Sequence, residues 1–189
     1  MRHPAVLRIA GSQRLLVAVG LALLAVGCAS PTPNRDPLGE TFPSVRGESL
    51  ERTPHRLPED FAGKPVLLLV GYVQNAQFDA DRWLLGLLQA EVPVQILEVP
   101  TIPGLFPRML ANTIDSGMRK GIPSEDWKSV VTVYRDAADI VRFTGNTNPR
   151  NMRVLLLDEE GRVVWFHDRG YSAGKLLELD RIVRGGTWR

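Results

Sequence analysis

VLLLVGYV, residues 66–73, is an uncharged apolar run that follows the turn at Lys64-Pro65. A short apolar run bounded by a turn is typical of a β-strand that is buried on both faces. We therefore predict a central strand over residues 66–73. The polar residues Gln74-Asn75-Ala76-Gln77 end this run and precede the next predicted element.

The residues that follow predict a helix and a second strand. Residues 78–90 repeat leucine at helical spacing, and Asp79 and Asp81 stand near the expected amino end, where the helix dipole favours negative charge. Residues 92–99 are rich in β-branched side chains and are closed by Pro100. The order strand, helix, strand predicts a crossover between two parallel strands.

An apolar stripe that steps by three and four residues predicts one amphipathic helix over residues 103–119. The simplest role of this stripe is docking against the sheet, and a surface for a partner or a membrane is the alternative. Four further elements are predicted: a strand at 130–134, a short helix at 137–143, a hairpin of strands 152–157 and 163–167 around a turn closed by Gly161, and a last helix at 172–184.

The first 27 residues have the outline of a secretory signal peptide. Residues 1–14 carry three arginines and no acid, and residues 15–27, LLVAVGLALLAVG, are uncharged and apolar. This run is short for a bilayer core, which needs about 20 residues. We therefore predict a removable leader rather than a permanent membrane span.

The tetrapeptide Ala25-Val26-Gly27-Cys28 resembles the lipobox of bacterial lipoproteins, in which the leader is cut before a cysteine whose sulfur carries a diacylglycerol. The resemblance implies lipidation of Cys28, palmitate-type acyl chains and attachment to a membrane. Because Ala29 rather than an aspartate follows, it also implies the periplasmic face of the outer membrane. Two or three buried acyl chains anchor a domain stably. An exported protein without a lipid is the alternative.

Residues 28–60 contain six prolines and little apolar periodicity. This composition favours an extended tether over a packed element, although a short strand near residues 41–45 is compatible with it. We therefore divide the chain into a signal peptide (1–27), a lipidated proline-rich tether (28–60) and a folded domain (61–189).

Charge and cysteine content exclude several functions. The formal charge is +2, but three arginines lie in the leader, so residues 28–189 carry a net charge of −1. Such a body lacks the positive field that binds phosphates, and we expect no nucleic-acid partner. A single cysteine excludes an internal disulfide, a tetrathiolate zinc site and a CxxC redox pair.

The order of predicted elements resembles the thioredoxin-like fold. The resemblance implies an α/β domain with a central mixed sheet flanked by helices and with one inserted helix. In this fold the redox cysteines lie between the first strand and the following helix, whose amino end stabilises a thiolate. Here that window, residues 71–79, reads GYVQNAQFD and contains no cysteine. A redox function is therefore not expected.

Residues 64–179 also resemble the mitochondrial Fo-ATPase assembly factor family, which is related to thioredoxin-like proteins. The segments that carry this resemblance are Gln77-Phe78-Asp79, Ile96-Leu97-Glu98-Val99-Pro100, Ile102-Pro103-Gly104, Met109-Leu110, Gly117-Met118-Arg119, Gly121-Ile122-Pro123, Val154-Leu155-Leu156-Leu157-Asp158 and Gly161-Arg162-Val163-Val164-Trp165. The resemblance implies a chaperone-like role, without catalysis, in assembling a membrane complex. An outer-membrane lipoprotein does not easily reach an Fo sector in the inner membrane, so the client stays open.

Four residues are candidates for binding a protein partner. Tyr72 and Gln77 flank the carboxyl end of the central strand, and Arg108 and Arg119 lie on the inserted helix. Together they predict a groove at the edge where this fold receives peptides. The alternative for Arg119 is an ion pair with Glu98 that ties the helix to the sheet. Other positions of interest are Pro100, Trp165 and Asp168.

No cofactor or metal is predicted. His55 and His167 stand without further ligands at metal-binding spacing, and the acidic turn at residues 158–160 is typical of a solvated hairpin tip. No nucleophile or phosphate-loop motif follows a strand. Two alternatives to a binding protein stay open: an enzyme that uses Tyr72, Gln77 and Asp79, and a passive structural lipoprotein without a concave polar surface.

Overall fold

The structure, a computed structural model, describes residues 31–186. One unit begins at Thr32 and continues through the described part of the chain. The signal peptide predicted for residues 1–27 and the lipidation predicted for Cys28 lie outside the described residues. Within residues 31–186, no helix is long and apolar enough to cross a membrane.

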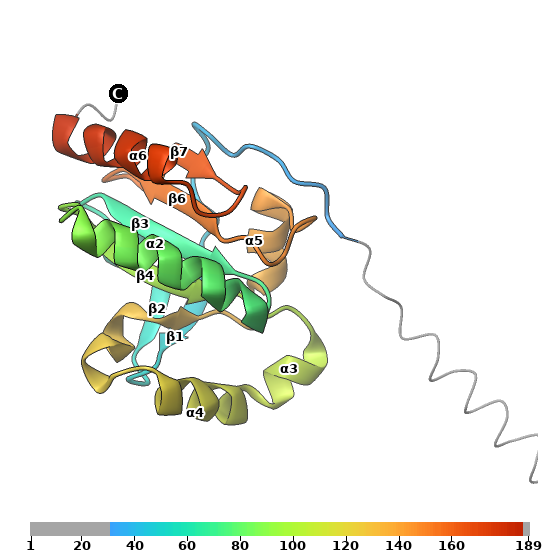
Figure 1. The fold of residues 1–189 in the computed structure, drawn as a ribbon. Coiled ribbons are helices and arrows are strands. Elements are labelled where there is room, and N and C mark those ends of the chain that lie inside the picture. The colour runs from blue at the N-terminus through green and yellow to red at the C-terminus, as the bar shows by residue number, and fades with distance from the viewer. Residues whose placement is uncertain (1–30, 187–189) are drawn as a thin grey trace, which may run out of the picture. The chain divides into compact units, whose positions relative to one another are not determined.

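Strand β3 (Val66–Gly71) is an inner strand of a four-stranded sheet with the order β4-β3-β6-β7 (Figure 1). It pairs in parallel with β4 (Gln95–Pro100) and antiparallel with β6 (Arg153–Leu157), and β7 (Val163–His167) completes an antiparallel hairpin with β6. The parallel crossover and the hairpin are therefore confirmed, and Gly161 in the hairpin turn has a φ of 80°.

Both faces of β3 are covered, as its uninterrupted apolar sequence predicts. Helices α2 (Gln77–Gln89) and α6 (Ala173–Gly185) lie over one face, where they bury Leu67 and Leu69 (Figure 1). Helix α5 (Ala137–Thr144) and a second sheet bury Leu68 and Val70 on the other face. Alternate side chains of one strand thus belong to two apolar cores.

The second sheet has the order β2-β1-β5 and consists of β2 (Pro54–Leu57), β1 (Val45–Ser49) and β5 (Val131–Thr132). It corrects the prediction of a tether over residues 28–60, because the described part of that region is folded onto the domain and buries Phe42, Val45 and Leu57. The prediction of a tether was wrong because it was based on the high proline content of residues 28–60. Pro54 begins an edge strand, a position that tolerates a missing N–H group.

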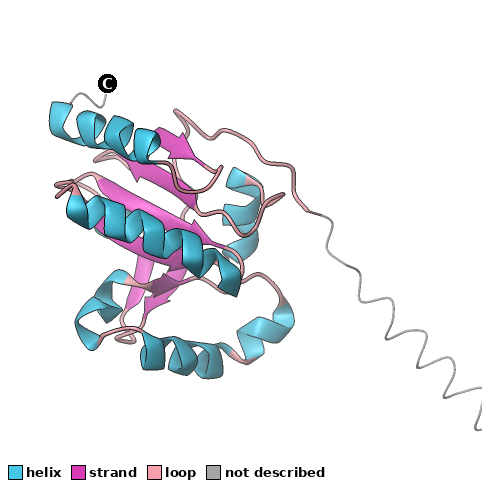
Figure 2. Cartoon of the chain, viewed as in Figure 1, coloured by secondary structure: helices cyan, strands magenta, loops and turns pink. Residues whose placement is uncertain are grey.

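The inserted segment also differs from the prediction of one helix over residues 103–119. It forms two helices, α3 (Leu105–Met109) and α4 (Ala111–Gly121), which meet at Leu110 (Figure 2). Its stripe does not dock uniformly on the sheet, since Phe106 and Met109 are 70% and 74% exposed. Three 3₁₀ turns complete the described elements: η1 (Glu59–Phe61), η2 (Gln74–Ala76) and η3 (Ser124–Ser129).

Candidate partner-binding groove

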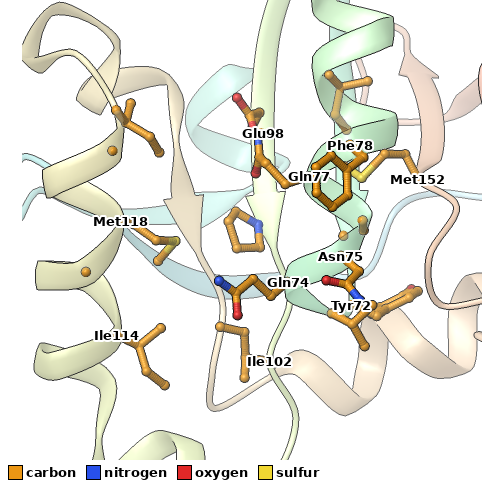
Figure 3. A pocket seen from close by; sticks show the side chains of 18 of the residues that line it. Tyr72, Gln74, Asn75, Gln77, Phe78, Glu98, Ile102, Ile114, Met118 and Met152 are labelled. Atoms are coloured by element: carbon orange, nitrogen blue, oxygen red, sulfur yellow. The ribbon is translucent and has the colours of Figure 1, made fainter.

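A groove of about 910 Å³ lies between α4 and the amino end of α2, above the carboxyl ends of β3 and β4 (Figure 3). Because β3 and β4 are parallel, their carboxyl ends meet at one edge of the sheet, where open α/β folds usually bind ligands. The lining residues are Leu69, Gly71, Tyr72, Val73, Gln74, Asn75, Ala76, Gln77, Phe78, Asp81, Glu98, Pro100, Ile102, Thr113, Ile114, Gly117, Met118, Gly121, Ile122 and Met152.

Polar contacts hold α4 in place from its other side. The Tyr134 hydroxyl donates to Asp115 at 2.7 Å, and Arg119 Nε donates to the Leu50 carbonyl at 2.6 Å. Burial and the neighbouring Asp115 carboxylate raise the pKa of Tyr134, so it stays a donor at neutral pH. With α4 fixed in this way, Ile114 and Met118 face the groove rather than the sheet (Figure 3).

Two of the predicted binding residues, Tyr72 and Gln77, line the groove. Gln77 is exposed, and its amide donates to Asp81 at 2.9 Å. Tyr72 is only 7% exposed, and its hydroxyl hydrogen-bonds with Thr144. Burial raises the pKa of Tyr72 to about 12. Tyr72 therefore lines the groove but offers it little polar function.

The two predicted arginines do not line the groove. Arg108 is exposed on α3, and Arg119 points away toward the Leu50 carbonyl, with its guanidinium carbon 5.9 Å from the centre of the Trp127 ring. The suggested ion pair between Glu98 and Arg119 is wrong, because neither residue belongs to an ion pair among the described residues. Arg119 donates to the backbone carbonyl of Leu50 instead of pairing with the Glu98 carboxylate.

Asp81 and Glu98 are the only charged side chains among the lining residues, and both are acidic. Glu98 is half-buried on β4 and lies close to Gln77 in Figure 3. Burial raises the pKa of Glu98, and the negative charges of Asp81 and Asp126 add to this effect, while hydrogen bonding from Gln77 opposes it. The sequence held one signal for this site: Glu98 is a lone acid inside an apolar strand.

Of the three residues suggested for catalysis, Gln77 lines the groove and Tyr72 and Asp79 are buried. Asp79 is 2% exposed, and its carboxylate accepts the backbone N–H groups of Met152 at 2.9 Å and Tyr171 at 2.8 Å. It also accepts a hydrogen bond from Arg82 at 3.2 Å. Its oxygens thus join the start of α2 to the residue before β6 and to the segment before α6. The polar atoms of Asp79 and Tyr72 are thus engaged in hydrogen bonds within the domain.

The other sequence candidates are divided between the groove and distant positions. Pro100 lines the groove. Trp165 is a core residue whose indole donates to Glu178 at 2.8 Å, and Asp168 accepts a hydrogen bond from Asn34 at 2.7 Å. Over residues 31–186, no group of three or more histidine, cysteine, aspartate or glutamate side chains is arranged to hold a metal ion.

Scans of the sequence against protein-family models and against curated proteins find no match. Solved structures do match. BsSco, of the Sco family of cytochrome c oxidase assembly proteins, shares 11% identity over 79% of this chain and 96% of its own, with a TM-score of 0.53. The thiol peroxidase of Chromobacterium violaceum shares 12% over 82% and 91%, with a TM-score of 0.52.

A third match is the copper-bound ScoI of Arabidopsis thaliana, at 11% identity over 77% of this chain and 99% of its own, with a TM-score of 0.51. The fold is thioredoxin-like. These likenesses define the fold alone, since the identities are low. The groove contains no cysteine or histidine, so it lacks the thiolate and imidazole ligands that copper sites commonly use.

Proposed function

We propose that this chain is a lipid-anchored, non-redox thioredoxin-like protein that binds a segment of a partner protein in the groove and assists assembly of an envelope or membrane complex. The observation that carries the proposal is the groove itself. It lies at the edge of the sheet where the sequence resemblance places a redox pair, yet residues 71–79 contain no cysteine. Apolar side chains, rather than reactive ones, form most of its surface.

The surroundings of the groove also support binding. Phe78 on α2 is 72% exposed, and Leu105, Phe106 and Met109 on α3 are each at least 65% exposed. Large apolar side chains gathered at the surface mark sites of protein interaction. A passive spacer has no need of such a surface, and an enzyme needs reactive groups that Asp79 and Tyr72 do not supply.

The anchor and the client belong to the same proposal. Lipidation of Cys28 and residence on the periplasmic face of the outer membrane rest on the lipobox resemblance. The role in assembly is supported by the resemblance to the Fo-ATPase assembly factors and by the likeness in fold to BsSco, a member of the Sco family of cytochrome c oxidase assembly proteins. The client is a protein whose exposed segment reaches the membrane surface that carries the lipid.

Site-specific photocrosslinking in native membranes tests the groove. A photoreactive amino acid at Ile114 lies in the groove, whereas one at the exposed Leu177 on α6 is the control. We expect a discrete adduct from position 114 only. The Gly117→Phe variant should abolish it, because Gly117 lines the groove and a Cβ added there has no atom within 4 Å, which leaves room for a larger side chain that occupies the groove. Equal adducts from both positions, or an adduct that survives Gly117→Phe, would contradict the proposal.

A separate experiment tests the anchor. Metabolic labelling with palmitate and membrane fractionation should show a labelled chain in the membrane fraction, and Cys28→Ser should lose both the label and the membrane attachment. Membrane attachment that persists in the Cys28→Ser protein would contradict lipid anchoring without affecting the groove.

A further inference from the structure

We propose that the groove selects a basic partner segment: an extended peptide in which one lysine or arginine, flanked by apolar side chains, places its cation against Glu98 and Asp81. This inference rests on the proposed function and adds the chemistry of the ligand. The predicted groove included Arg108 and Arg119, but neither lines the observed groove, whose charged residues are both acidic.

The first argument is charge complementarity. Twenty residues line the groove, and the two that carry charge are both carboxylates. Asp126 on η3 adds a third negative charge close enough to affect Glu98. A peptide with a positive side chain is attracted to such a surface and an acidic peptide is repelled.

The second argument is that these carboxylates lack a counter-ion. Among residues 31–186, no ion pair includes Asp81, Glu98 or Asp126. The nearby arginines are engaged elsewhere: Arg82 contacts Asp79 and the Phe78 carbonyl, and Arg119 contacts the Leu50 carbonyl. Within the described residues, the carboxylates of the groove therefore have no ion-pair partner.

The third argument is the position of Glu98. Its carboxylate is half-buried, and its raised pKa shows that the surroundings disfavour the negative charge. A cation that arrives beside it reverses this effect, because an opposite charge favours the ionised carboxylate. A charge-assisted hydrogen bond in this sheltered position is stronger than one in open solvent.

The fourth argument concerns the walls. Ile114 and Met118 on one side and Phe78 on the other offer apolar surface to the neighbours of the basic residue (Figure 3). The methylene stem of lysine or arginine also packs on apolar surface while its charged end reaches a polar group. Gln74 and Asn75 at the rim provide amides that can hydrogen-bond with the main chain of the peptide.

Fluorescence anisotropy with the full chain solubilised in detergent tests the inference. The probes are two labelled nine-residue peptides of leucine and isoleucine, one with a central arginine and one with citrulline, its neutral isostere. We expect the arginine peptide to bind at least tenfold more tightly. Glu98→Gln should remove most of this difference, and raising the salt concentration should reduce it.

Two further variants separate the possible results. Glu159→Gln, at the exposed hairpin turn, is the matched control and should leave both affinities unchanged. Gly117→Phe should block both peptides. Equal binding of the two peptides that Gly117→Phe abolishes would overturn the charge selection and leave the groove proposal intact. No binding, or binding that Gly117→Phe does not affect, would overturn both.

Discussion

The guanidinium carbon of Arg153 lies 5.3 Å from the centre of the Tyr72 ring, and the Arg153 side chain is completely buried. Arg153 forms no ion pair within the described residues. Its N–H groups donate instead to the carbonyls of Gly145, Asn148 and Asn151 at 3.2, 2.7 and 2.8 Å. The Arg153 guanidinium thus holds together residues 145–151, the loop that precedes β6.

Arg153→Lys should lower the free energy of unfolding by about 2–4 kcal/mol, because a single ammonium cannot satisfy carbonyls placed around a planar fork and leaves buried acceptors without donors. Urea unfolding followed by circular dichroism measures this. Arg150→Lys, at an exposed position in the same loop, is the control and should change stability by less than about 0.5 kcal/mol. Equal losses in the two variants would show that the hydrogen bonds of Arg153 contribute little.

Gly145→Ala should be severely destabilising. Gly145 has φ 72° and ψ 170°, and an added Cβ would lie 2.2 Å from the Pro33 carbonyl oxygen and 2.4 Å from Asn34 Cα. The backbone must move, so we expect a loss of more than about 3 kcal/mol in thermal or urea unfolding.

Gly104→Ala is the matched control for Gly145→Ala. Gly104 has a similar backbone conformation, φ 117° and ψ 158°, but its added Cβ would meet Pro107 Cδ at an ordinary 3.4 Å. It should cost only the backbone strain, about 1–3 kcal/mol. The difference between the two variants measures how tightly residues 33–34 pack on the end of α5. A difference near zero would contradict that packing.

Glu98→Gln should stabilise the protein at neutral pH. The pKa of Glu98 is raised in the folded state by burial, so folding favours the protonated carboxyl. The wild type therefore loses stability as pH rises from the unfolded pKa of about 4.3 through the folded pKa, and glutamine avoids this loss. We expect a melting temperature about 3 °C higher at pH 7.

The gain from Glu98→Gln should disappear below about pH 4, where the carboxyl is protonated in both states. A gain that does not depend on pH would contradict an origin in the charge. Asp81→Asn reports on a neighbouring carboxylate that is exposed, and its effect on stability should be smaller.

Asp136→Asn should show the opposite dependence on pH. Hydrogen bonding from Arg46 lowers the pKa of Asp136 to about 2. Its contribution is therefore present above the unfolded pKa of about 3.9 and is lost as pH falls toward 2. Because Arg46 is largely exposed, we expect a loss of about 1 kcal/mol at pH 7 that vanishes near pH 2.

Acid titration of the folded protein followed by circular dichroism measures the effect of Asp136. Asp139→Asn removes a surface ion pair with Arg142 and is the control, so the wild-type acid transition should persist in that protein. A transition that is unchanged in Asp136→Asn as well would show that other carboxylates govern acid unfolding.

The central sheet could be predicted because its signal is local and unambiguous. Residues 66–71 are apolar without interruption, which is typical of a strand that is buried on both faces, and the crossover to Gln95–Pro100 follows from the right-handed βαβ rule. The hairpin turn at Gly161 is equally local. In each of these cases the residues whose pattern predicts the element are the same residues that form it.

The inserted helices could not be predicted to the same degree. A stripe at helical spacing shows that a helix has an apolar face, but it does not show what covers that face. The position of α4 depends on Asp115, Tyr134 and Leu50, which are distant in sequence. For this reason the apolar stripe predicts docking on the sheet, whereas Ile114 and Met118 face the groove, and the suggested pairing of Arg119 with Glu98 is wrong.

Because residues 32–60 fold onto the domain, they limit how far the domain can lie from a lipid attached to Cys28. Thr32 is held by two hydrogen bonds with Asn146, one through the side-chain oxygen and one through the backbone N–H of Asn146. If Cys28 carries the proposed lipid, four residue steps connect it to Thr32. A fully extended chain spans at most about 3.6 Å per residue, so the segment between Cys28 and Thr32 is at most about 14 Å long. The anchored domain would then stay against the bilayer, and a client would have to bring its segment down to the lipid surface.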